Sequence, residues 1–224
     1  MSGQSIEASQ KAAADYWTAR LRNVQHAAFP PTKGTKSSEP TSVKVLRKDI
    51  ELPGSSNASI QQSDLLRAAW AIVLARHSDS DDVCFGTTIS GQQQGSELAT
   101  VPFRTQLDGT ELVSSLLQKV QRQSLDSTTF GHIGLKSIAD LGADASAACD
   151  FASIVSFHNT TSSTPLVHID TGSSLVIEAQ PISNGIQTSF SYNSSLLNEQ
   201  QVDGLSHQVE HVAQQLLSHG AETR

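Results

Sequence analysis

Apolar residues recur at helical spacing in three long segments of the chain. Residues 59–78 carry a broad apolar stripe formed by Ile60, Leu65, Leu66, Ala69, Trp70, Val73 and Leu74. Residues 198–218 carry a second stripe, formed by Val202, Leu205, Val209, Val212 and Leu216. In residues 8–23, a third stripe consists of Ala13, Trp17 and Leu21. These patterns predict three amphipathic helices, and Ser59 is placed to cap the helix over 59–78.

Shorter patterns predict two more helices and seven strands. The helices span 111–127 and 134–142, and Gly142 closes the second of them. The strands are expected at 43–52, 83–90, 99–107, 149–159, 165–170, 174–182 and 185–193. The first strand alternates apolar and polar residues, whereas the apolar, β-branched run after residue 82 is typical of an interior strand. Pro102 indicates an edge strand or a bulge, and Asn184-Gly185 predicts a hairpin between the last two strands.

Helices and strands alternate along the chain with little sequence between them. This order predicts the α/β class, with a mixed β-sheet and packed helices in one domain over residues 1–224. We expect residues 1–10 to be a flexible N-terminus. Residues 30–42 and 91–98 are expected to be loops, because they are rich in Pro, Gly, Ser and Gln.

Composition excludes two kinds of partner. The 224 residues include 15 Lys and Arg against 22 Asp and Glu, which gives a net charge of -7, and the basic residues are scattered. We therefore expect no general affinity for nucleic acid or for an anionic membrane. The sequence contains no signal-peptide pattern and no membrane-spanning run, so we place the protein in the cytoplasm. Cys84 and Cys149 lie in apolar stretches and are predicted to be reduced core residues.

Two groups of residues have the types, but not the pattern, of a metal site. His207 and His211 lie four residues apart on a predicted helix, but no third ligand or H-E-x-x-H glutamate accompanies them. Asp79, Asp81 and Asp82 lie close together, yet this segment lacks the glycine and the closing glutamate of a calcium loop. We therefore predict no metal site and interpret the acidic segment as a solvated turn.

Nucleophile and phosphate-binding motifs are also incomplete. Ser90-Gly91 lies outside any G-x-S-x-G pattern, and residues 86–95 lack the lysine and the glycine spacing of a phosphate loop. His158 follows a predicted strand with no acidic residue beside it in the sequence, so we interpret it as a loop residue. The residues alone thus predict no catalytic residue and no cofactor site.

Several segments, taken in order, resemble one protein family. Residues 64–91, DLLRAAWAIVLARHSDSDDVCFGTTISG, are similar to the helix, S-D-D-V turn and T-x-x-S-G strand of nonribosomal peptide synthetase condensation domains. Further similar segments are ADYWTARL at 14–21, the A-T-V-P strand and helix at 99–123, FGHIGLKSIADLGADASAACDFASIVSF at 130–157, and the last strand and helix from 185. The A-T-V-P form is one that fungal members often carry.

The resemblance implies half of a two-lobed enzyme. Condensation domains combine two lobes related to chloramphenicol acetyltransferase, and their N-terminal lobe carries the motif H-H-x-x-x-D-G. This chain has no adjacent histidines and resembles the C-terminal lobe alone. Without that motif and the opposite channel wall, the lobe is expected to be unable to orient two carrier-bound substrates.

Two departures from the family pattern accompany this loss. Only residues 92–98 lie where the family has a longer stretch ending in G-P, and Thr129-Phe130-Gly131 replaces P-F-E. Together with the Met1 start, these features favour a truncated condensation domain over a fragment of a complete one. We expect a non-catalytic scaffold that contacts the following adenylation domain, and a peptidyl carrier domain is a second expected partner.

Two enzymatic alternatives remain open at this stage. The chain could be the C-terminal half of a competent condensation domain that forms peptide bonds between carrier-bound substrates. Alternatively, it could be an acyltransferase that self-associates and uses His158. A carrier-docking module is a third, non-enzymatic alternative.

Overall fold

The computed structural model describes residues 2–24, 29–30, 42–53, 60–89, 98–158 and 173–221. Its elements are α1 (Ser2–Leu21), β1 (Val43–Glu51), α2 (Gln62–Ser78), β2 (Asp82–Ile89), β3 (Ala99–Gln106), α3 (Val113–Phe130), the 3-10 turn η2 (Gly131–Ile133), α4 (Gly134–Ala139), α5 (Ala143–Cys149), β4 (Ser153–Phe157), β5 (Leu175–Ile182), β6 (Gly185–Asn193) and α6 (Glu199–Ala221). The order of elements confirms the predicted α/β class.

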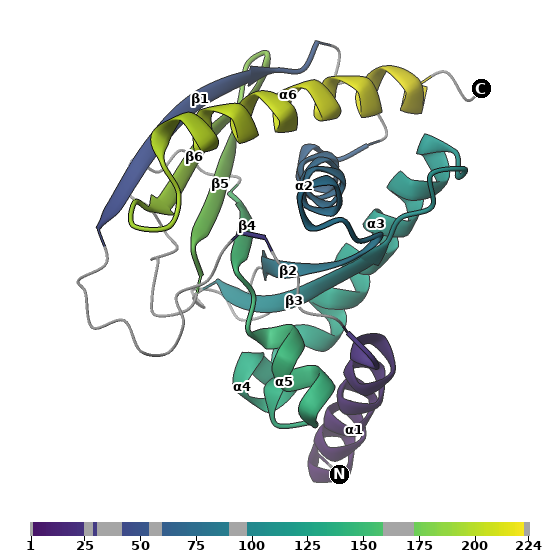
Figure 1. Cartoon of the computed structure of the whole chain (residues 1–224). Coiled ribbons are helices and arrows are strands. Elements are labelled where there is room, and N and C mark those ends of the chain that lie inside the picture. Colours follow the sequence, from purple (N-terminus) through teal and green to yellow (C-terminus); the bar gives the residue numbers. More distant parts are fainter. Residues whose placement is uncertain are drawn as a thin grey trace.

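The six strands form one mixed sheet in the order β1-β6-β5-β4-β2-β3 (Figure 1). The three central strands β2, β4 and β5 run parallel to one another, and the outer pairs are antiparallel. Strand β2 is interior and β3 is an edge strand, as the apolar run and Pro102 predicted. Proline is tolerated at an edge because it has no N–H to donate to a further strand.

The predicted hairpin is present between β5 and β6. Ile182 pairs with Gly185, which leaves Ser183 and Asn184 as a two-residue turn. Gly185 has a φ of 153°, and a Cβ built there would lie 2.0 Å from the carbonyl oxygen of Ile50 in β1. Glycine is therefore required at this position both by the turn and by the close approach of the edge strand.

The main hydrophobic core lies between the sheet and the helices α2, α3 and α6. The apolar stripes predicted for α2 and α6 face this core, where Trp70, Leu66 and Val209 are fully buried. Trp70 also donates from Nε1 to the hydroxyl of Ser153 at 3.1 Å, which satisfies its only polar atom. Figure 1 shows α6 crossing over α2 on this side of the sheet.

A second, smaller core joins α1, α4 and α5 to the β2–β3 end of the sheet. Trp17 is fully buried there and donates from Nε1 to the carbonyl oxygen of Phe130 at 3.0 Å. The Phe130 ring stacks on Tyr16 with a centroid distance of 4.5 Å. In Figure 1, α1, α4 and α5 form a separate layer below the strands.

Several predicted boundaries differ from the structure. Helix α1 begins at Ser2, so residues expected to be a flexible N-terminus are helical; the helix contains five alanines, the residue that most favours helix. The N-cap of α2 is Gln61 rather than Ser59. The short helix ends at Ala139, α5 is a helix that was not predicted, and β4 is shorter than the strand expected at 149–159. The strand predicted at 165–170 and most of the loops at 30–42 and 91–98 lie outside the described residues.

Candidate functional site

Four polar side chains meet near the carboxyl ends of β2 and β4. The Oγ1 atom of Thr88 lies 2.8 Å from the Oγ atom of Ser156, which lies 3.0 Å from Nε2 of His158. The same Nε2 lies 3.5 Å from Oε1 of Glu178, because Ser156 and Glu178 are paired across the parallel strands β4 and β5. We call Thr88, Ser156, His158 and Glu178 the strand-end cluster.

The strand-end cluster is buried. Ser156 is fully buried, and the side chains of His158 and Glu178 are only 9% and 8% exposed. Polar groups at such depth must satisfy one another, since they have lost their contacts with water. The cluster therefore ties the three parallel strands together by side-chain contacts in addition to their backbone ladder.

His158 follows β4 directly, as expected of a loop residue, but the fold gives it an acidic neighbour that the adjacent sequence lacks. Glu178 follows it by twenty positions in the sequence and reaches it only because β4 and β5 are neighbours. The geometry nevertheless differs from a Ser-His-acid triad, in which the hydroxyl and the carboxylate face different ring nitrogens. Here both groups face Nε2, so Glu178 does not stand behind His158 as an orienting acid.

A buried ion pair lies next to this cluster at the start of α2. Arg67 donates from Nη1 to Oδ1 of Asp64 at 3.0 Å and from Nε to Oγ1 of Thr87 at 2.9 Å. Ser124 of α3 donates to the same Asp64 oxygen at 2.6 Å. Burial lowers the pKa of Arg67, although the Asp64 carboxylate opposes this effect. This network joins α2 to β2 and α3.

The acidic turn predicted at 79–82 connects the end of α2 to the start of β2. Asp79 is the C-cap of α2, with a left-handed φ of 50°, and its N–H bonds to the carbonyl oxygen of Ala75. Asp82 begins β2 and forms an ion pair with Arg104 across the sheet at 2.5 Å. Asp79 and Asp81 are exposed. The three carboxylates thus have different environments and do not converge as in a calcium loop.

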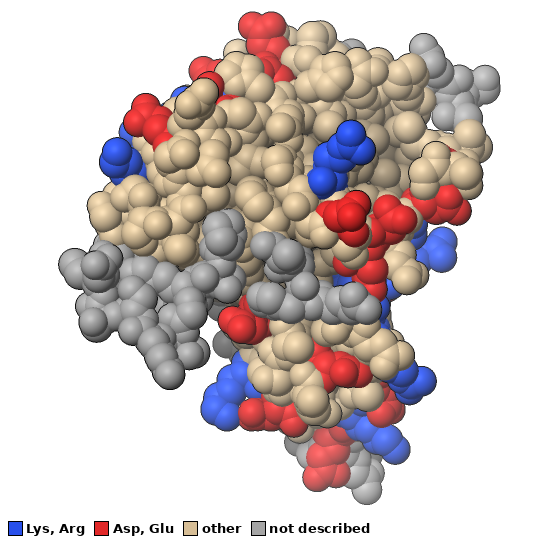
Figure 2. Space-filling model, viewed as in Figure 1, with Lys and Arg blue, Asp and Glu red and all other residues tan. Residues whose placement is uncertain are grey.

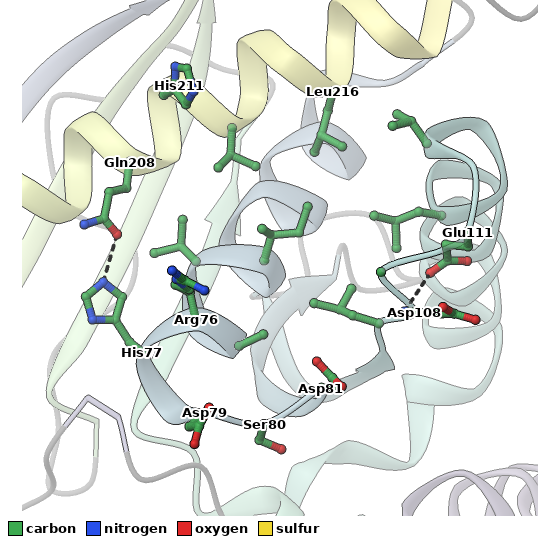
Figure 3. A pocket seen from close by; sticks show the side chains of 18 of the residues that line it. Arg76, His77, Asp79, Ser80, Asp81, Asp108, Glu111, Gln208, His211 and Leu216 are labelled. Atoms are coloured by element: carbon green, nitrogen blue, oxygen red, sulfur yellow. Dashed lines mark hydrogen bonds between the residues drawn. The ribbon is translucent and has the colours of Figure 1, made fainter.

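A wide groove opens between α2, α6 and the connection from β3 to α3 (Figure 3). Its volume is about 1300 Å³. His207 and His211, which lie one turn apart on α6, both line it. His207 Nδ1 lies 2.9 Å from the carbonyl oxygen of Asp203. In the described part of the chain, no three His, Cys, Asp or Glu side chains come together as a set of metal ligands.

The two cysteines lie on β2 and α5. The Sγ of Cys84 lies 3.7 Å from the carbonyl oxygen of Ala148, beside the smaller core. Burial raises the pKa of Cys84 to about 12 and that of Cys149 to about 11. Both are free thiols, and at neutral pH neither is a thiolate nucleophile.

The remaining sequence candidates are only partly described. Ser90, Gly91 and residues 92–97 lie outside the described residues, so the nucleophile and phosphate-loop interpretations are not tested by the structure. Gly131, where the family pattern has a glutamate, lies against β2 and β3. A Cβ at this position would lie 2.2 Å from Cδ1 of the buried Ile89, so a larger residue requires Ile89 to repack.

The fold and its sequence define a member of the condensation domain family. The family model for the condensation domain matches residues 2–224, and the chain belongs to this family. It is 29% identical over 93% of its length to the nonribosomal peptide synthetase ungA' of Aspergillus campestris, of which it covers 2%. It is 28% identical over 94% of its length to N-benzoylphenylalaninol synthetase apmA of Penicillium brevicompactum, of which it covers 10%.

Solved structures of low sequence identity share the fold. The crystal structure of holo T3CT matches 92% of this chain with a TM-score of 0.75 at 20% identity. A mutant of the starter condensation domain of rhizomide synthetase RzmA, in complex with C8-CoA and Leu-SNAC, matches 97% with a TM-score of 0.70 at 15% identity. The chain spans about half of each of these structures, 51% and 54% respectively. The chain thus has the fold of one lobe of the chloramphenicol acetyltransferase-like architecture, as predicted.

Among the described residues, none of the helices combines the length and the apolar character needed to cross a bilayer.

Proposed function

We propose that this chain is a non-catalytic lobe of a condensation domain that acts as a structural partner of an adenylation domain in a nonribosomal peptide synthetase. The synthetase would work in the cytoplasm, and this chain by itself would not be an enzyme. Family membership and the large fungal synthetases among its relatives support the setting. The absence of two adjacent histidines from the 224 residues supports the lack of catalysis, because the family motif needs them.

One observation carries the proposal. The strand-end cluster combines a hydroxyl, an imidazole and a carboxylate, and its Ser156 is fully buried. This arrangement lacks the geometry of a Ser-His-acid triad, because Ser156 and Glu178 both lie near Nε2 of His158 and no described carboxylate is seen to orient the ring from the other nitrogen. The arrangement supports a structural role for these polar residues.

A domain of this fold can serve as a binding partner. The X-domain from teicoplanin biosynthesis, which matches 94% of this chain with a TM-score of 0.73 at 14% identity, is found in complex with OxyB. At this identity the match concerns the fold alone. It supports the idea that a condensation-type fold can provide an interaction surface.

The scaffold role is tested by deleting residues 1–224 from the parent synthetase. We expect a lower soluble yield, a lower melting temperature and weaker amino-acid-dependent pyrophosphate exchange by the adenylation domain. The control removes the same lobe from one sample and adds it back as a separate chain. Unchanged yield, stability and exchange after the deletion would rule out the scaffold role.

The lack of catalysis is tested by His158→Ala. We expect acyl transfer from phosphopantetheinyl-carrier or coenzyme A thioesters to stay at the background level before and after the substitution. A measurable transfer that His158→Ala abolishes would instead support the self-associating acyltransferase. Titration with a phosphopantetheinylated carrier protein tests the carrier-docking role separately.

A second candidate function follows from the coverage of the solved structures. Because the chain spans about half of them, a preceding lobe with H-H-x-x-x-D-G would complete a channel for peptide-bond formation. In that case, the full synthetase should form a peptide bond at this domain, and replacing the second histidine of that motif should abolish it.

A further inference from the structure

The groove shown in Figure 3 is larger than a typical pocket for a small molecule. Its volume of about 1300 Å³ exceeds the roughly 300–1000 Å³ typical of small-molecule pockets. Its floor is apolar and comes from all three helices of the main core. The floor residues are Ile72, Val73, Ala75, Val113, Leu116, Val212 and Leu216.

The charges around this floor are unevenly placed. Among the described residues that line the groove are four carboxylates, Asp79 and Asp81 after α2 and Asp108 and Glu111 before α3, whereas Arg76 is the only Lys or Arg among them. Figure 3 shows these acids along the sides opposite α6. Figure 2 shows acidic side chains gathered where Figure 1 places the end of α2 and the start of α3.

The acids of the groove remain available to a partner. Glu111 forms an ion pair with Lys119 at 2.8 Å, but Asp79, Asp81 and Asp108 form no ion pair within the described residues. Asp108 accepts hydrogen bonds from the N–H and hydroxyl of Thr110, and these lower its pKa. It is therefore ionised at neutral pH, like any exposed carboxyl group.

The wall formed by α6 differs from the acidic side. It presents His207, Gln208 and His211, and no carboxylate of α6 lines the groove. Gln208 also contacts His77 of α2, with Oε1 2.8 Å from Nε2, which links the two walls at one end. A ligand that fits this groove thus needs an apolar face, positive charge along one edge, and neutral polar groups along the other.

The lining also restricts the backbone of the ligand. All the described lining residues belong to helices or to connections, and none of them belongs to a strand. A partner cannot extend the sheet here, so it must satisfy its own backbone hydrogen bonds. An α-helix does this, and amphipathic helices bind apolar grooves through side chains at i, i+3, i+4 and i+7.

We propose that the groove binds an amphipathic α-helix of a partner protein or domain, with its apolar face on the floor and Lys or Arg side chains along the edge that meets Asp79, Asp81 and Asp108. This inference names the chemistry of a partner for the scaffold role and rests on that proposed function. The charge pattern contributes orientation, because a reversed helix would place its basic edge against α6.

A pair of designed peptides tests the proposal on the whole chain. One fluorescein-labelled peptide of about 18 residues has leucines at helical spacing and lysines along one edge; its match carries glutamates in place of the lysines. By fluorescence anisotropy, we expect the lysine peptide to bind at least about tenfold more tightly, and to weaken with added salt. Equal binding of both peptides would overturn the proposal.

Matched variants test whether the lysine peptide binds in the groove. Asp79→Asn/Asp81→Asn removes two groove charges while keeping the side-chain shape, and asparagine tolerates the left-handed backbone of position 79. The control Glu7→Gln/Asp15→Asn removes two exposed charges of α1, at the other end of the molecule. We expect the groove variant to weaken binding about five- to tenfold and the control less than about twofold. Equal effects would show non-specific attraction to an acidic protein and overturn the proposal.

The outcomes for the groove and for the scaffold role are separable. If deleting the lobe harms the adenylation domain but neither peptide binds in the groove, the groove proposal fails and the scaffold role stands. If the groove binds the lysine peptide as described but deletion has no effect, the scaffold role fails instead. Circular dichroism of each variant checks that the fold is unchanged.

Discussion

Two polar regions of this lobe use their charges in opposite ways. In the strand-end cluster and the adjoining Asp64–Arg67 pair, buried polar groups bond to one another and join strands to helices. Around the groove, exposed carboxylates lie beside an apolar floor and leave most of their hydrogen-bonding capacity to solvent. The difference indicates that the first region stabilises the fold, whereas the second is available for a partner. Substitutions in the two regions should therefore affect different measurements.

The largest effect is expected from breaking the buried ion pair. Arg67→Met leaves the Asp64 carboxylate buried with its charge unpaired, which typically costs about 3–5 kcal/mol. Urea unfolding followed by tryptophan fluorescence measures the loss. The double variant Asp64→Leu/Arg67→Met removes both charges and should cost less than Arg67→Met alone. A double variant as unstable as the sum of the two single ones would show that the pair does not act as a unit.

Removing the central hydroxyl of the strand-end cluster should have a smaller effect. Ser156→Ala takes a hydrogen-bonding partner from both Thr88 and His158 in a buried setting, which corresponds to about 1–3 kcal/mol. Ser115→Ala on the exposed side of α3 is the matched control and should change the stability by less than about 0.5 kcal/mol. If the two substitutions cost the same, the cluster contributes nothing specific to the fold.

The sequence predicted much of this buried framework but not its polar contacts. The stripes of α2 and α6, the β5–β6 hairpin and the edge position of Pro102 all follow from local patterns. The contact of His158 with Glu178 depends on which strands become neighbours, and local sequence does not contain that information.

The groove could not be predicted from the sequence for the same reason. Its lining comes from segments as far apart as residues 72–81 and 207–216, which meet only in the folded chain. The spacing of His207 and His211 predicts a shared helix face, and Asp79 and Asp81 are interpreted from the sequence only as a turn, while nothing in the sequence connects Asp108 or Glu111 with either group. A helix face becomes a candidate site only when the elements that surround it are known.

A partly buried thiol beside the smaller core provides a pH-dependent test of the stability of the fold. Burial raises the pKa of Cys84 from 9.0 to about 12, so the unfolded chain loses this proton first as the pH rises. The folded state is unaffected below about pH 9, and stability is lost progressively between about pH 9 and 12. By pH 10 the Cys84 contribution to this loss is about 1 kcal/mol.

The contribution of Cys84 is isolated by comparing pH profiles. Urea unfolding at pH 8 and at pH 10 should show a smaller decline for Cys84→Ala than for the unchanged protein, whatever the absolute stability of the variant. Cys149→Ala, at the other free thiol, serves as the comparison. An identical decline with and without Cys84 would mean that this thiol is as accessible to ionisation in the folded state as in the unfolded one.

The smallest expected change in stability separates the two regions most clearly. Asp79 holds a left-handed backbone at the C-cap of α2, a conformation that glycine adopts with less strain, so Asp79→Gly should leave the stability unchanged or raise it by up to about 1 kcal/mol. The same substitution removes a groove carboxylate and should weaken binding of the lysine peptide. Asp79→Asn keeps the side chain and loses only the charge, so it should weaken the peptide to the same extent without the gain in stability. If Asp79→Gly weakens peptide binding while the stability of the fold stays the same or rises, the charge of Asp79 serves a partner rather than the fold. If both variants lose stability, Asp79 belongs with the buried polar groups that stabilise the fold.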